Sequence, residues 1–217
     1  MPFSSVLGAS TIIKPGVCTS TNRPTSPYDG QVIYETDTDS AMVWNGTGWV
    51  VLSTGRANPG GLDLIKVQTI GTAVTSVTVS NVFSSTYDNY RVVFGGMNCS
   101  ANDQVGLLTF GSTTTGYYGT FTYDRYDTTG SVLKRNNSSS IYAGISDTTS
   151  ASNFSFDVFS PNLTKRTTVT GAGFGYANSF WFSGMVADTT QYTAFTLTGG
   201  GSSTMTGGTI AVYGYAK

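Results

Sequence analysis

The chain has 217 residues, 11 of them basic and 12 acidic, with no histidine and a formal net charge of −1. This even balance, with scattered cations, argues against nucleic-acid binding, which needs several clustered cations to neutralise phosphates. The lack of histidine excludes Ser-His-Asp and Cys-His nucleophiles and histidine-ligated zinc, and two cysteines cannot form a zinc cage, so we expect no metal or cofactor.

We predict that residues 1–24 form an extended arm. The segment has too few apolar residues to form a core by itself, so it should become ordered only against neighbouring molecules. No basic region precedes its first apolar residues, and Lys14-Pro15 interrupts them, so we expect no secretory signal. No apolar run in the chain reaches the length of a membrane helix, about 18 residues, so we expect no membrane partner either.

A small β-meander is predicted next. Residues 31–35, 41–44 and 48–52 are short apolar strands, separated by the polar turn at 36–40 and by Asn45-Gly46, a pair typical of tight hairpins. Asp37-Thr38-Asp39 in the first turn could supply oxygen ligands for calcium, but it lacks the glycine and glutamate of an EF-hand loop. A hydrated turn is therefore the favoured interpretation.

Three large aromatic residues, Tyr34, Trp44 and Trp49, stand in this meander. Each can remove about 150–250 Å² of surface from water, yet three short strands bury little among themselves. The rings either form the meander's own minimal core or provide an oligomer or attachment interface, and we take them as the candidate interface.

Residues 23–39, followed by 43–46 and 48–49, contain the pattern P-x-x-G-Q-x-x-Y-x-T-D-T and then W-x-G-x-x-W. This pattern resembles a segment found in structural proteins of tailed bacteriophages, namely tail-fibre, collar, head-fibre and capsid-decoration proteins. The resemblance implies a non-enzymatic virion component, commonly a homotrimer, whose front module lies near the particle and whose β-domain points outward.

Residues 55–61 contain turn and linker residues with almost no apolar content, and we place the boundary between two domains there. The domains are then residues 1–54, an attachment or oligomerisation arm with the meander, and residues 62–217. The second domain alternates short strands with turns about every ten residues, which predicts a jelly-roll-like antiparallel β-sandwich. The fold class is therefore all-β, with the last strand at 209–215 built into the sheet.

Recognition by the sandwich is expected in its loops, predicted at 112–118, 128–140 and 199–208, because a rigid sheet positions variable tips. Trp181, between two phenylalanines, could stack on a sugar ring, but a buried position is the favoured interpretation. The candidate glycan contacts are tyrosines, which combine an apolar ring with a hydrogen-bonding tip: Tyr117, Tyr118, Tyr123 and Tyr126. For Tyr117 and Tyr118, the glycan contact and an ordinary structural role remain equally open.

We therefore expect no catalytic residue. A glycosidase would need two carboxylates about 5–9 Å apart, and their separation cannot be read from the sequence. The predicted function is that of a virion structural protein, assembled in the host cytoplasm, that decorates or cements a capsid or forms a short fibre. The alternative is a tail-fibre adhesin that recognises a bacterial surface glycan. The expected partners are two further copies of the chain and other virion proteins.

Overall fold

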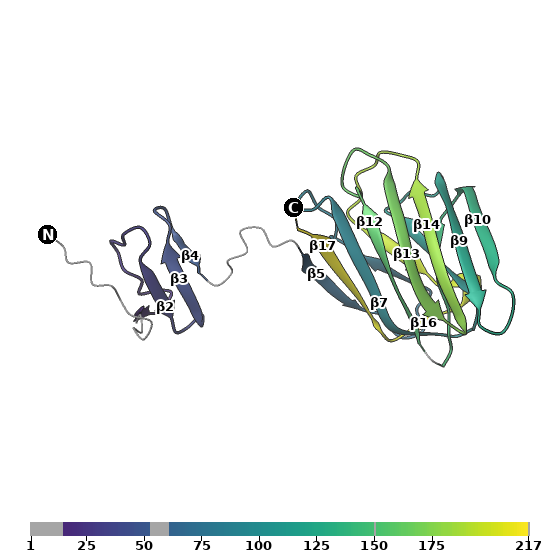
Figure 1. Ribbon diagram of the computed structural model, residues 1–217, viewed down its shortest axis with the longest axis horizontal. Helices are drawn as coiled ribbons and strands as arrows, with labels where there is room; N and C mark the ends of the chain where they lie inside the picture. The colour runs from purple at the N-terminus through teal and green to yellow at the C-terminus, as the bar shows by residue number, and fades with distance from the viewer. Residues whose placement is uncertain (1–14, 53–60, 150, 217) are drawn as a thin grey trace. The chain divides into compact units, whose positions relative to one another are not determined.

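The computed structural model describes residues 15–52, 61–149 and 151–216, and these are built almost wholly of β-strands (Figure 1). Contacts divide the chain into two compact units, residues 1–57 and 58–217. No α-helix occurs among the described residues. The predicted all-β fold, a small meander followed by an antiparallel sandwich, is confirmed. Most of the predicted arm, residues 1–14, and of the predicted linker, all but Gly61, lies outside the described residues.

The front unit is a four-stranded sheet with the order β1-β2-β3-β4. Its strands are β1 (Gly16–Cys18), β2 (Val32–Glu35), β3 (Ser40–Trp44) and β4 (Trp49–Val51). Strands β2 to β4 form the predicted antiparallel meander. β1 was not predicted. It runs parallel to β2, with Val17 opposite Tyr34, so part of the predicted arm belongs to the sheet.

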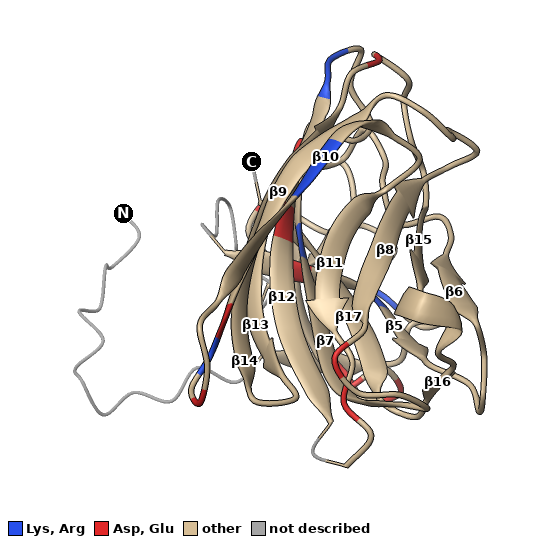
Figure 2. Ribbon diagram, turned by 90° about the vertical axis from the view of Figure 1, so that its right-hand side faces the viewer, with Lys and Arg blue, Asp and Glu red and all other residues tan. Residues whose placement is uncertain are grey.

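The second unit is a sandwich of two facing antiparallel sheets (Figure 2). In order across the larger sheet lie β10 (Ser131–Ser138), β9 (Tyr117–Arg125), β14 (Asn178–Val186), β13 (Thr167–Gly175), β12 (Ser152–Phe159), β7 (Asn89–Cys99), β17 (Thr209–Tyr215) and β5 (Leu62–Thr69). The smaller sheet has the order β11 (Ile141–Ile145), β8 (Val105–Phe110), β15 (Phe195–Thr198) and β6 (Ser76–Val79). The short β16 (Met205–Thr206) pairs with the end of β7.

The core lies between the sheets and is rich in phenylalanine. Along β12, Phe154 and Phe156 are buried while the residue between them faces outward, as the alternation predicts. Phe94 of β7 stacks on Phe154 with ring centroids 4.4 Å apart. Burying one such side chain stabilises the fold by about 1.5–3 kcal/mol. The large sheet is thus a rigid platform whose other face, here called the outer face, points away from the smaller sheet.

All three predicted loops contain regular structure. Residues 117–118 of the first loop begin β9. Residues 128–140 include β10, and residues 199–208 include β16 and a 3-10 turn (Gly200–Ser202), so the last segment is not the irregular loop that we predicted. Ser203 and Met205 within it are buried. β10 was not predicted because its sequence is polar and lacks the apolar alternation of a strand. An edge strand with little buried surface needs few apolar residues.

Candidate functional site

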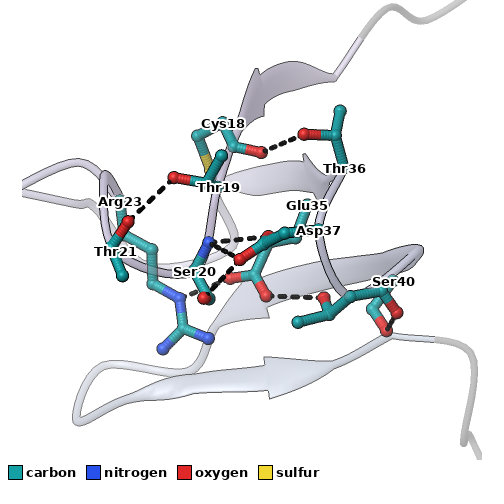
Figure 3. Close-up of polar contacts among 10 residues, drawn as sticks. Cys18, Thr19, Ser20, Thr21, Arg23, Glu35, Thr36, Asp37 and Ser40 are labelled. Atoms are coloured by element: carbon teal, nitrogen blue, oxygen red, sulfur yellow. Dashed lines mark hydrogen bonds and ion pairs between the residues drawn. The ribbon is translucent and has the colours of Figure 1, made fainter.

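The acidic turn of the front unit holds the segment that follows β1 (Figure 3). Asp37 accepts hydrogen bonds from the backbone amide of Ser20 at 2.8 Å and from its hydroxyl at 2.5 Å. These bonds lower the pKa of Asp37 below its usual range. Thr36 donates from its backbone amide to the carbonyl of Cys18 at 3.0 Å. The T-D-T turn is therefore a clasp that fixes β1 beside β2.

A partly buried ion pair joins the same two segments. Glu35 is almost completely buried and is paired with the guanidinium of Arg23, and Thr38 donates its hydroxyl to the other carboxylate oxygen at 2.9 Å. The bond from Arg23 lowers the pKa of Glu35, and Glu35 in turn raises the pKa of Arg23. A buried carboxylate needs such partners, because an unpaired charge is costly to desolvate.

The second aspartate of the turn has a separate partner. Tyr34 donates its hydroxyl to Asp39, while Asp37 is engaged by Ser20, so the two carboxylates are each used by a protein donor. Within the ranges that the structure describes, no group of three or more His, Cys, Asp or Glu side chains could hold a metal ion. These contacts agree with the interpretation of this segment as a structural turn.

The three aromatic residues of the meander do not share one surface. Trp44 and Trp49 face each other across the β3-β4 pair, with ring centroids 5.7 Å apart and an edge-on geometry. Tyr34 pairs with Ala41 on β3. Side chains alternate along a strand, so Ala41 and Tyr34 lie on the face of the sheet opposite to Met42 and Trp44. The predicted interface of Tyr34, Trp44 and Trp49 is thus split between two faces.

The face that carries Tyr34 is apolar, and we call it the valine face. Register pairs align Val17 with Tyr34 and Ala41, and Val32 with Val43 and Val50, on the same side of the sheet. None of the six residues is buried, and Val17 and Val50 are exposed. Among the described residues of the front unit, only Ile33, Glu35 and Met42 are buried. The unit therefore presents more apolar side chains on this face than it buries.

Tyr117 is not available to a ligand. Its ring is fully buried, and its hydroxyl accepts a hydrogen bond from the amide of Phe110 at 2.8 Å and donates to the carbonyl of Thr113 at 3.1 Å. Burial raises the pKa of Tyr117 to about 12. The predicted glycan contact at this position is wrong, because the first residue of β9 faces the core.

The other three tyrosines are separated. Tyr118 faces outward and lines a shallow hollow of about 670 Å³ with Lys134 and Met185. Tyr123 faces inward beside Phe121, with ring centroids 6.1 Å apart. Tyr126, just after β9, is 82% exposed. Alternation along β9 sends Tyr118 and Tyr123 to opposite faces, so the tyrosines do not form one site.

Trp181 is a functional candidate, although its position between two phenylalanines favoured a buried side chain. It is 53% exposed on the outer face of the large sheet, while its neighbours Phe180 and Phe182 are buried in the core. Successive side chains of a strand point to opposite faces of the sheet. Because Phe180 and Phe182 face the core, Trp181 between them must face outward. Because three aromatic residues follow one another here, the sequence shows no alternation of apolar and polar residues.

Two carboxylates of the sandwich, Asp127 and Asp103, are bound to one cation. Arg125 lies 2.8 Å from Asp127 and 3.7 Å from Asp103. The bond from Arg125 lowers the pKa of Asp127. A general acid needs a raised pKa, so this arrangement does not resemble the acid of a glycosidase.

Comparisons with protein-family models, with curated proteins and with solved structures found no match. Within residues 15–52, 61–149 and 151–216, there is no helix of the length and hydropathy needed to cross a membrane.

Proposed function

We propose that the chain is a non-enzymatic structural component of a tailed-bacteriophage particle, which decorates or cements the capsid or forms a short fibre. The front unit docks on other virion proteins and on two further copies of the chain, and the sandwich projects outward. The virion assignment is supported by the P-x-x-G-Q-x-x-Y-x-T-D-T pattern, and the docking role by the structure of the unit that contains this pattern.

The valine face is the observation that carries the docking role. A four-stranded sheet that buries only Ile33, Glu35 and Met42 among its described residues has little core to stabilise it. Covering the valine face with another protein surface would remove several branched apolar side chains from water, each contributing at most about 1.5–3 kcal/mol. The clasp of Asp37 and the Arg23–Glu35 pair keep the sheet in register for that contact.

Particle composition tests this function. Particles that carry the chain are purified, and its copies are counted by quantitative mass spectrometry for the natural chain and for Val43→Lys. A lysine on the valine face places a charge in the interface, so the copy number should fall about tenfold or more. Val132→Lys is the matched control, because Val132 is an exposed valine of the sandwich, and its copy number should not change.

The copy number also separates the two roles considered for a virion protein. Many copies per particle support decoration or cement, whereas a few copies at the tail support the adhesin alternative. Absence of the chain from the particles, or equal incorporation of Val43→Lys and the natural chain, would contradict the proposal.

A further inference from the structure

The outer face of the large sheet carries solvent-exposed aromatic side chains. Trp181 of β14 and Phe174 of β13 are each 53% exposed, and Tyr126 lies beyond the end of β9. Trp181 stands opposite Ala172, and Phe174 stands opposite Ser179, so the two rings are diagonal neighbours on adjacent strands. Such positions are about 7–8 Å apart, within reach of large side chains. The rings follow one another across the face.

Beside Trp181 the face is hollowed by about 260 Å³, and we call this the Trp181 hollow. Small side chains line it, namely Thr170 and Ala172 on β13 and Ser155 on β12. β14, which carries Trp181, and β12, which carries Asp157, are two strand spacings apart, about 10 Å. The hollow thus has an aromatic wall, a small-residue floor and a charged wall.

The charged wall is held in place by its own hydrogen bonds. Nη1 of Arg91 lies 3.4 Å from Asp157, and Nη2 donates to the hydroxyl of Ser155 at 3.0 Å. The hydroxyl of Tyr215 donates to Asp157 at 2.7 Å. The side chains of Arg91 and Asp157 remain 38% and 22% exposed. A guanidinium has five N–H donors and a carboxylate accepts at both oxygens, so both keep capacity for a ligand.

A second, smaller hollow of about 110 Å³ continues the track past Phe174. It is lined by Tyr126, Phe174, Ser179 and Asp124 among others. Two hollows with an aromatic ring at each suit a chain of repeated rings better than a single compact ligand. Their volumes lie below the range of about 300–1,000 Å³ that is typical of enclosed small-molecule sites.

We propose that the outer face of the large sheet binds a neutral oligosaccharide, with one sugar ring stacked on Trp181 and the next on Phe174. A pyranose ring has an apolar C–H face for an aromatic ring and a rim of hydroxyls for Arg91 and Asp157, which supply donors and acceptors side by side. A nucleic acid would need several cations, and the Trp181 hollow has only Arg91, already paired with Asp157.

This site belongs to the sandwich alone and does not depend on the proposed function. The valine face and the Trp181 hollow are on different units, so each is tested by its own substitution. Failure of particle incorporation by Val43→Lys and failure of glycan binding by Trp181→Ala are therefore separate results.

An oligosaccharide array tests the site. The full chain is applied to an array of neutral and acidic bacterial oligosaccharides, and each glycan that it binds is titrated with the natural chain, Trp181→Ala and Val132→Ala. Trp181→Ala should weaken binding of a neutral oligosaccharide by about tenfold or more, because the stacking surface is lost. Val132→Ala is the control, since Val132 is exposed on the same register row but outside the hollow.

A spectroscopic readout distinguishes contact from indirect effects. Trp181 is one of three tryptophans, and the other two are in the front unit. Ligand should change the fluorescence of the natural chain but not that of Trp181→Phe. Binding to no neutral oligosaccharide of the array, or undiminished binding by Trp181→Ala, would overturn the proposal. A lower mass of Trp181→Ala in solution would also overturn it, because the ring would then be an interface between copies of the chain.

Discussion

At the scale of single residues, the front unit depends on two carboxylates whose partners keep them ionised. Glu35 is buried against Arg23, and Asp37 accepts hydrogen bonds from Ser20. Both carboxyls have a lower pKa in the folded chain than in an unfolded one. The unfolded chain therefore takes up protons first on acidification. Their contribution to stability is present above the unfolded pKa values, about 4, and is lost as the pH falls through the folded values.

The front unit should consequently unfold at a lower temperature in acid. In a Trp181→Phe chain the remaining tryptophans, Trp44 and Trp49, report the front unit alone. The midpoint of their thermal transition should be constant between about pH 5 and 7 and should fall as the pH is lowered toward about 3. Glu35→Gln should lower the midpoint at pH 7 and weaken its pH dependence. A midpoint that is unchanged down to about pH 3 would contradict this account.

Residue exposure was the least predictable feature of the candidate sites. Tyr117 was a candidate glycan contact and is buried, whereas Trp181 was predicted to be buried and is exposed. Both lie in runs of aromatic residues, where composition alone cannot fix which side chains face the core. Their direction depends on the strand register, and a shift of one residue exchanges the two faces.

At the scale of elements, β13 lies where the core leaves little room for side chains. Its inward positions include Gly171 and Gly173, and a Cβ added at Gly173 would come within 2.2 Å of the Cβ of Phe154. The same addition at Gly171 would come within 2.5 Å of the Cβ of Phe156. The phenylalanines of β12 thus fill the space that side chains on β13 would occupy. The glycines are required by packing, since a backbone this close leaves no room for a side chain.

Gly173→Ala should therefore destabilise the sandwich by about 1–3 kcal/mol, the usual cost of overpacking a dense core. Ala172→Ser changes the next residue, which faces outward and is exposed, and it should leave the stability nearly unchanged. Denaturant unfolding followed by circular dichroism measures both. Equal stability of Gly173→Ala and the natural chain would contradict this prediction, because the core would then have room for a methyl group at this position.

The strands themselves were largely predictable. Residues 209–215 were predicted with the bounds that β17 has, because they combine clear alternation with flanking turn residues. The polar edge strand β10 and the short β1 were missed. β1 contains only Gly16–Cys18, too few residues to show an alternation of apolar and polar side chains. Its partner is β2, which lies more than ten residues further along the chain.

At the scale of the whole molecule, the two units differ in how they are stabilised. The sandwich has a continuous core in which residues of both sheets, such as Phe94 and Phe195, are buried together. The front unit buries few side chains and presents the valine face. The turn and linker residues at 55–61 led us to predict a boundary between two domains. The strand order of the sheets could not be predicted, because it depends on pairings between residues far apart in the chain.

The central claim is that the valine face is an interface between copies of the chain. Light scattering of the purified full chain tests it most directly, with Val43→Lys and the control Val132→Lys measured alongside. We predict a mass of about three times the 22.8 kDa chain for the natural protein and for Val132→Lys, and a single-chain mass for Val43→Lys. A mass of 22.8 kDa for the natural protein, or a trimer that Val43→Lys leaves intact, would contradict the claim.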